Sequence, residues 1–422
     1  MESPAAALIP DRRLLLATAE ALGQEIWDRR ETDAKGGVNW LGPRMASPTE
    51  PFRMAPIGPH LYSGKAGVAL FLAALANVLG KPEYGDLSLQ AIASLRSQVT
   101  GLVADRERAT RSSLGLGGTF GVGAVIYSLV RIGVLLGEPD LVSEAHAFTA
   151  LLTPERVAAD HLLDVVLGAA GALLALLALA EVAPEANETG VTPLELAAAC
   201  GDHLIGQRVS FEGRPRAWVT IAGHPPLSGF SHGAAGICCA LLRLYGRTAR
   251  PELLAAAEEG LAFERTTYDP VKKNWRDMRV LDSTRPRYLT NWCHGAPGVA
   301  LGRLGALDVL DTPEIRDELE RALETTAALP QTPLDHVCCG NMGRAEVLLC
   351  AAGQLAAHRL DAALELTGGV LDRARQSGHF GWLPPAESYQ FDPSFFSGAA
   401  GLGYTLLRLA EPDALPCVLL LA

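Results

Sequence analysis

Residues that could carry metal or acid–base chemistry gather in three short stretches of this 422-residue chain, each ending on a glycine. The stretches are Ser231-His232-Gly233, Trp292-Cys293-His294-Gly295 and Cys338-Cys339-Gly340. Thiolates bind Zn²⁺ readily, and a catalytic zinc site combines three protein ligands with an open fourth position. Cys293, Cys338 and Cys339 would supply the three ligands. The sequence therefore predicts one zinc site of the catalytic kind.

A sequence repeat places these stretches at one level. The pattern Gly-x-x-Gly at the start of an apolar helix occurs seven times, 45 to 65 residues apart, with first glycines at positions 64, 118, 168, 233, 295, 340 and 398. Such self-similarity is typical of repeat architectures. The three cysteines and His232 stand one or two positions before the first glycine of units four to six. The repeat therefore predicts that they meet on adjacent units at one end of the molecule.

Each repeat has room for a second, more exposed helix, for example over residues 251–265 and 312–328. Seven units of two helices predict an all-α fold, an α/α toroid in which seven outer helices surround seven inner ones. A solenoid of stacked helix pairs is the alternative. We favour the closed ring because the first and last units are alike and neither looks like a polar capping repeat.

The N-terminal part lies outside this repeat. A helix is predicted over residues 12–29, and the proline- and glycine-rich residues 36–60 should be mostly loop. We expect one structural domain, in which residues 1–60 pack on a toroid formed by residues 61–422.

The composition excludes several classes of partner. A net charge of −11 argues against a nucleic-acid or anionic-membrane surface. The longest apolar run, around residues 169–180, is too short to span a bilayer, and the N-terminus has no basic segment typical of a signal peptide. We therefore predict a cytoplasmic protein with no membrane insertion and with reduced cysteines.

Three further assignments stay open on the residues alone. Five cysteines are interpreted as small core residues: Cys200, Cys238, Cys239, Cys350 and Cys417. His232 could be a fourth ligand, a general acid or a hydrogen-bond partner at the start of a helix. Asp164, four residues before Gly168, could cap a helix or act in the site.

Several motifs resemble one family. They are Asn39-Trp40-Leu41-Gly42, Leu61-Tyr62-Ser63-Gly64, Ser231-His232-Gly233-Ala234-Ala235-Gly236, Trp292-Cys293-His294-Gly295-Ala296-Pro297-Gly298, Cys338-Cys339-Gly340-Asn341 and Phe396-Ser397-Gly398-Ala399-Ala400-Gly401-Leu402-Gly403-Tyr404. Together they look like the lanthionine synthetase C-like cyclase family, and more narrowly like the C-terminal cyclase domain of class II lanthipeptide synthetases. The resemblance spans nearly the whole chain and also implies an α/α toroid.

The resemblance implies a lanthionine cyclase that uses one zinc ion. Its substrate would be a dehydrated precursor peptide, leader plus core, whose cysteines add to dehydroalanine or dehydrobutyrine to form (methyl)lanthionine thioether rings. By the family's motifs, Cys293, Cys338 and Cys339 match the zinc ligands, and His232 and Asp164 match the active-site histidine and aspartate. His232 would protonate the enolate, and Asp164 would hold a histidine tautomer or orient the substrate. A dehydratase, either fused or separate, would supply the peptide.

The sequence departs from the family pattern at two positions. Many stand-alone cyclases have histidine where this chain has Cys339, so the site would carry three thiolates. Some members have an arginine four residues before the first zinc cysteine, where this chain has Leu289. Arg285, Arg287 and His294 are nearby in sequence, but the group that stabilises the enolate stays unassigned.

Two other functions remain as alternatives. A glycoside hydrolase with the same fold would need two carboxylates at the mouth of the barrel, where this chain has cysteine and histidine. A non-catalytic, zinc-stabilised peptide-binding scaffold would close its metal site with a fourth ligand, His232 or His294.

Overall fold

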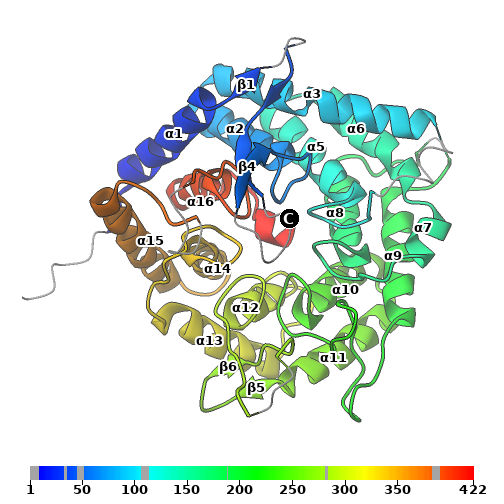
Figure 1. Ribbon diagram of the computed structural model, residues 1–422. Coiled ribbons are helices and arrows are strands. Elements are labelled where there is room, and N and C mark those ends of the chain that lie inside the picture. Colours follow the sequence, from blue (N-terminus) through cyan, green and yellow to red (C-terminus); the bar gives the residue numbers. More distant parts are fainter. Residues whose placement is uncertain are drawn as a thin grey trace, which may run out of the picture.

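Two concentric rings of helices form the computed structural model (Figure 1), which describes residues 9–32, 36–44, 52–105, 114–187, 189–280, 284–382 and 390–422. Seven helices of this described part make the inner ring: α2 (Lys65–Leu79), α5 (Val122–Leu136), α8 (Ala169–Val182), α10 (Ala234–Thr248), α12 (Ala296–Leu304), α14 (Asn341–Gln354) and α16 (Ala399–Ala410). Each packs against the next, and α16 packs against α2. The predicted toroid is confirmed, and the open solenoid is wrong.

The outer ring, within the same described residues, consists of α1 (Arg12–Asp28), α3 (Pro82–Ala104), α6 (Pro139–Phe148), α9 (Pro193–Gly206), α11 (Pro251–Arg265), α13 (Pro313–Ala328) and α15 (His358–Ser377). Five of them begin with proline, whose missing N–H costs nothing at that position. Each outer helix packs on the inner helix that precedes it in the chain, and α1 packs on α16. The N-terminal helix therefore completes the seventh pair. A division of the chain at residue 60 stays a prediction.

Glycines shape the turn that begins each inner helix. In six units the first glycine of the repeat is the residue just before the helix, and the second glycine lies three residues later. A Cβ atom on that second glycine would lie 1.8–2.3 Å from the carbonyl oxygen of the residue six positions earlier. The turn folds back so tightly on the helix that any side chain there would collide with it. The second glycine is thus required by its own turn and not only by crowding between helices.

Unit two differs from its predicted register. Helix α5 begins after Gly121, and Gly118 lies in the turn instead of directly before the helix. Gly118 is needed for a different contact, because a Cβ atom there would lie 3.0 Å from the Cα atom of Gly171 in α8. The assignment of Gly118 as the first glycine of the unit is therefore wrong by three residues.

Short β-ribbons join some of the helices. Strand β1 (Glu31–Thr32) pairs with β2 (Val38–Asn39), β3 (Leu41–Arg44) pairs with β4 (Arg53–Pro56), and β5 (Tyr268–Asp269) pairs with β6 (Asn274–Trp275), all antiparallel. The described part of residues 36–60 is therefore less irregular than the predicted loop. Trp40 explains why, since its side chain is fully buried and its indole donates to the carbonyl of Ile26 at 2.7 Å.

Short helices α7 (Pro154–Ala158), η1 (Thr149–Leu151) and η2 (Val418–Leu420) complete the described structure. The last of these belongs to the C-terminal segment, which lies near the centre of the ring (Figure 1). Carbonyl groups of this segment accept hydrogen bonds from inner-ring residues, for example from the indole of Trp292 to Leu419 and from the Tyr127 hydroxyl to Ala422. The chain therefore fills the middle of its own barrel. Among the described helices, none is long and apolar enough to cross a membrane.

Candidate metal centre

Three thiols converge at the mouth formed by the turns before α12 and α14. The Sγ atom of Cys339 lies 3.5 Å from that of Cys293 and 3.3 Å from that of Cys338, and all three lie within 4.8 Å of one another. Zinc bonds of about 2.3 Å in tetrahedral geometry place thiolates about 3.8 Å apart. Cys293 and Cys338 are buried and Cys339 is half-buried. The three residues predicted as metal ligands are therefore brought together, and their chemistry and spacing fit a zinc ion.

The three thiols are coupled to one another. Contacts with the thiols of Cys293 and Cys338 lower the pKa of Cys339 below its usual range. Contacts with Cys293 and Cys339, together with burial, raise the pKa of Cys338 well above its usual range. A divalent cation bound among them would be surrounded by three sulfur ligands.

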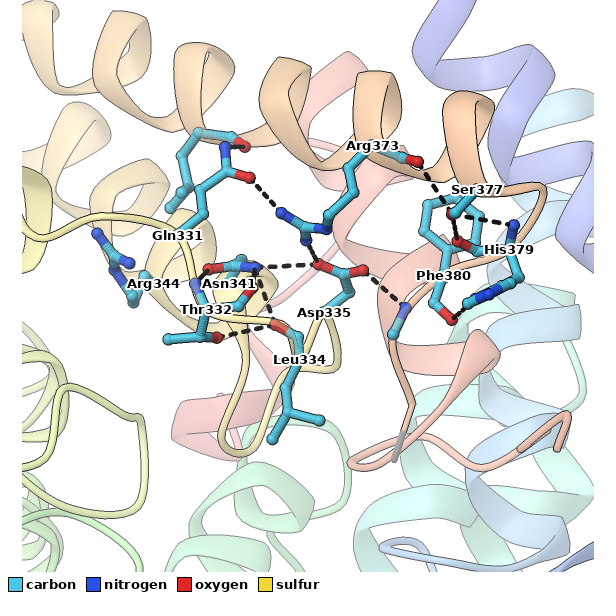
Figure 2. Close-up of polar contacts among 12 residues, drawn as sticks. Gln331, Thr332, Leu334, Asp335, Asn341, Arg344, Arg373, Ser377, His379 and Phe380 are labelled. Carbon is cyan, nitrogen blue, oxygen red and sulfur yellow. Dashed lines mark hydrogen bonds and ion pairs between the residues drawn. The ribbon is translucent and has the colours of Figure 1, made fainter. Parts of the chain in front are cut away.

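A polar network fixes the turn that carries Cys338 and Cys339 (Figure 2). The buried carboxylate of Asp335 pairs with Arg373 of α15, accepts from the Asn341 amide at 3.0 Å and accepts from the backbone amide of Gly381 at 2.8 Å. Burial raises the pKa of Asp335, but these three donors satisfy its oxygens. The network ties the turn to both helices of its unit, so the two thiols are held before any metal binds.

The turn that carries Cys293 depends on an asparagine and a glycine. Asn274 of β6 accepts from the amide of Ala296 at 2.9 Å and donates to the carbonyl of Leu289 at 3.0 Å. Gly295 has a φ of +88°, and a Cβ atom there would lie 1.7 Å from the Leu289 carbonyl oxygen. Only glycine fits this backbone.

Backbone hydrogen bonds link the turns around the mouth. An amide of one unit donates to a carbonyl of the next at 2.9–3.4 Å in five places: Cys338 to Phe396, Phe396 to Tyr62, Tyr62 to Thr119, Thr119 to Val166, and Ser231 to Cys293. The last of these bonds holds the turn of His232 against the turn of Cys293. The predicted common level of the site residues is thus built into the backbone.

His232 and Asp164 form a pair beside the thiols. The Nδ1 atom of His232 lies 2.7 Å from Oδ2 of Asp164, whose other oxygen accepts from the amide of Leu167 at 2.7 Å. Asp164 is 1% exposed, whereas the His232 side chain is 26% exposed. An ionised carboxylate only accepts, so Nδ1 carries the hydrogen and Nε2 is available for proton transfer. Asp164 both caps its turn and orients the histidine.

No histidine belongs to the thiol group among the described residues. His294 is buried, with Nδ1 3.4 Å from the carbonyl of Ser228 and no partner on Nε2. Burial and the nearby guanidinium of Arg279 lower the pKa of His294 to about 4, so the ring is neutral. Within the described residues, His232 and His294 therefore lie outside the group of three thiols.

Aromatic rings line the barrel near this layer. Centroid distances of 4.8–5.9 Å link neighbouring rings in the order Phe230, Trp292, Phe396, Tyr62 and Phe120. Burial and the three thiols raise the pKa of Tyr62 well above its usual range. These rings give the thiol cluster an apolar surrounding, in which electrostatic interactions are stronger than in water.

A cavity of about 740 Å³ opens beside Cys293 and Cys339. Leu289 lines its wall, as do Arg279 and Arg287. Arg285 is exposed and does not line the cavity. Sequence reasoning missed Arg279, because a single arginine in a loop 14 residues before Cys293 gives no pattern.

The remaining cysteines lie away from the mouth. Burial raises the pKa of Cys200 to about 12 and that of Cys239 to about 11, as expected for core thiols. A second group that could hold a metal comprises Glu346, Cys350 and Cys417. Arg408 already pairs with Glu346 there, so the cluster holds a cation of its own.

Comparisons with known proteins concern the family and the fold of this chain. The sequence model of the family described as lanthionine synthetase C-like protein matches residues 55–420. A search of the curated proteins finds no match. Among solved structures, a nisin cyclase is 18% identical with a TM-score of 0.59, covering 86% of this chain and 92% of its own. A GH76 α-mannanase from Bacteroides thetaiotaomicron is 9% identical with a TM-score of 0.52, covering 96% of both chains.

These structural matches concern the fold alone. A peptide cyclase and a polysaccharide hydrolase share the toroid, so its function has to be argued from the site. At the mouth of this chain the converging groups are three thiols and a histidine–aspartate pair.

Proposed function

Because the chain belongs to the lanthionine synthetase C-like family, we propose that it is a zinc-dependent lanthionine cyclase. It adds the cysteine thiols of a peptide to dehydroalanine or dehydrobutyrine and so forms thioether rings. The observation that carries this proposal is the group of three thiols, which has no fourth ligand residue among the described residues, on turns that adjoin the turn of His232 and its partner Asp164.

Cys293, Cys338 and Cys339 would hold the zinc ion. When bound, zinc would favour the thiolate form of a substrate cysteine, whose pKa is otherwise near 8.5. The three protein thiols are kept in place by the Asp335 network and by Asn274. The protein therefore presents a prearranged set of ligands to the metal.

His232 moves the proton. The substrate thiol loses its proton, its sulfur bonds to the β-carbon, and the electrons of the double bond pass to the carbonyl oxygen as an enolate. A proton then bonds to the α-carbon. His232 Nε2 can take up the first proton and deliver the second, while Asp164 holds Nδ1–H. The peptide gains one ring and keeps its mass.

The buried surroundings of the site favour this addition. Phe230, Trp292 and Phe396 are buried and pack on one another near the turns that carry the thiols. A dry site strengthens the interaction of fixed charges with the developing enolate. The partners that this function needs are a dehydrated precursor peptide and a dehydratase, fused or separate, in the cytoplasm.

A non-catalytic zinc scaffold is the second candidate. It would need a fourth protein ligand, but in the described residues His232 faces Asp164 and His294 stays outside the thiol group. The lack of a fourth ligand among these residues favours the cyclase.

The two candidates are separated by a synthetic peptide that carries one dehydroalanine and one cysteine. The peptide is incubated with the zinc-loaded protein, any remaining thiol is alkylated, and the mass is measured. The parent protein should protect the thiol without changing the peptide mass. Cys293→Ala should leave the thiol free, whereas Cys200→Ala, a change in the core, should act like the parent. Equal protection by Cys293→Ala and the parent would defeat the proposal.

A further inference from the structure

The cavity next to the thiols is lined by both charged and apolar residues. Leu289, Leu334, Pro333 and Val280 line it, together with the side chains of Arg279 and Asp277. Its volume of about 740 Å³ is large enough for several peptide atoms beside Cys293 and Cys339. A residue bound here would lie next to the open position of the metal centre.

The guanidinium of Arg279 has a fixed orientation in this cavity. Its Nε and Nη2 atoms each donate to one oxygen of Asp277 at 2.9 Å, and its backbone amide donates to Oδ1 at 3.1 Å. Asp277 is 3% exposed, and its own amide donates to the carbonyl of Arg287 at 2.8 Å. A buried carboxylate that holds two nitrogens in a fork leaves Nη1 as the donor available to a ligand.

Arg279 is also electrically coupled to the metal ligands. Its pKa is raised first by the hydrogen bonds to Asp277, and the thiols of Cys293 and Cys339 raise it further. The side chain is 33% exposed, so it is accessible from the cavity while lying near the thiols. Arg279 is thus a permanent cation beside the place where the new bond forms.

We propose that the cavity receives the dehydroamino acid and that Arg279 donates a hydrogen bond to its carbonyl oxygen. This inference rests on the proposed cyclase function. As the sulfur bonds to the β-carbon, the electrons of the double bond shift onto that oxygen, and the guanidinium stabilises the negative charge without giving up a proton. The proton that ends on the α-carbon comes from His232. Arg279 is therefore a catalytic residue, and Asp277 is a positioning residue.

The apolar wall complements this role. Leu289 and Leu334 would pack on the unsaturated side chain, whose β-carbon must face the thiolate. The apolar contact and the hydrogen bond from Arg279 would together set the orientation of the acceptor. An acidic residue next to the acceptor would be attracted by the two arginines of the cavity, Arg279 and Arg287.

The test compares Arg279→Gln and Arg279→Lys with the parent in steady-state cyclisation of the synthetic peptide. Arg279→Gln should lower kcat by about 10²–10³, with little change in KM or zinc content. Arg279→Lys keeps the charge but loses the fork, so its kcat should fall about tenfold. Arg285→Gln changes an exposed arginine of the same loop and should behave like the parent.

A second readout follows the enolate itself. The ring product in D₂O exchanges its α-hydrogen through the same enolate, so Arg279→Gln should slow the exchange by a similar factor. Parent-level kcat and exchange in Arg279→Gln would overturn the inference. If that variant fails to fold or to hold zinc, parent-level kcat in Arg279→Lys would overturn it instead. If Cys293→Ala is inactive but the Arg279 variant has parent-level kcat, only the role of Arg279 is refuted. An inactive parent protein would instead refute the cyclase function.

Discussion

Cys339 would set the charge of the proposed zinc centre. Three thiolates on Zn²⁺ would carry a net charge of −1, and a substrate thiolate would bring the total to −2. Such a centre should bind the substrate thiolate less readily but leave it more nucleophilic. The position at the mouth and the short distances to Cys293 and Cys338 show that Cys339 belongs to the cluster.

Replacing this cysteine tests the effect of charge. We expect Cys339→His to retain zinc, since imidazole is also a zinc ligand, and to cyclise more slowly at saturating substrate. Zinc analysis and initial rates on the synthetic peptide measure both properties. Faster cyclisation by Cys339→His at saturating substrate would count against the charge argument.

The histidine–aspartate pair makes a second prediction at this scale. His232→Asn should lower kcat by about 10²–10⁴ because general acid–base catalysis is lost, while zinc stays bound. Asp164→Asn should cost less, since the histidine remains but its tautomer is no longer fixed. His146→Asn on the outer helix α6 serves as the matched control. Loss of zinc in His232→Asn would indicate a ligand role in place of an acid–base role.

Residue types and spacing predicted much of this site. The repeat register was enough to group the three cysteines with His232, since equivalent positions of a closed ring lie at one level. The contact of Asp164 with His232 spans 68 residues and could only be proposed from the family resemblance. Arg279 could not be predicted, because it enters the cavity through a loop outside the repeat.

The turn is the element that repeats with the least variation. In six units the carbonyl oxygen six residues before the second glycine lies so close to that glycine that a Cβ atom would not fit, and this holds although the intervening residues differ. Gly-x-x-Gly therefore predicted where inner helices begin, except in unit two. There the glycines serve the close contact between Gly118 and Gly171, and a pattern of glycines alone cannot distinguish the two purposes.

Two glycines of α14 allow a direct test of this turn. A Cβ atom at Gly343 would lie 2.0 Å from the Val337 carbonyl oxygen, whereas nothing lies within 4 Å of one at Gly353. Gly343→Ala should lower the free energy of unfolding by more than about 2 kcal/mol and weaken zinc binding through Cys338. Gly353→Ala should raise it by about 0.5–1 kcal/mol. Urea unfolding measures both, and equal stability of the two variants would contradict the steric explanation.

At the scale of the whole molecule, helix packing closes the ring. Contacts of α16 with α2 and α1 join the two ends of the chain, and the C-terminal segment fills the axis. The similarity of the first and last repeats predicted closure. The filled axis was not predicted, because the last residues carry apolar side chains but no repeat signal.

Metal removal should therefore leave the toroid folded. Treatment with a chelator is expected to abolish cyclisation and to leave the helical circular dichroism signal unchanged. The midpoint of thermal unfolding should fall by less than about 10 °C, since a bound ligand adds only a few kcal/mol. Readdition of zinc should restore both cyclisation and the midpoint of thermal unfolding. Loss of the helical signal on chelation would show that the metal holds the fold together.

Two turns of the ring bring three thiols together, and the proposed zinc ion there would keep its fourth position open to a substrate thiol. Zinc X-ray absorption spectroscopy tests this central claim directly. The resting protein should show three sulfur ligands at about 2.3 Å and one light atom, and addition of the cysteine-containing peptide should raise the sulfur count to four. A site with four protein ligands, histidine included, and an unchanged spectrum with the peptide would contradict the account.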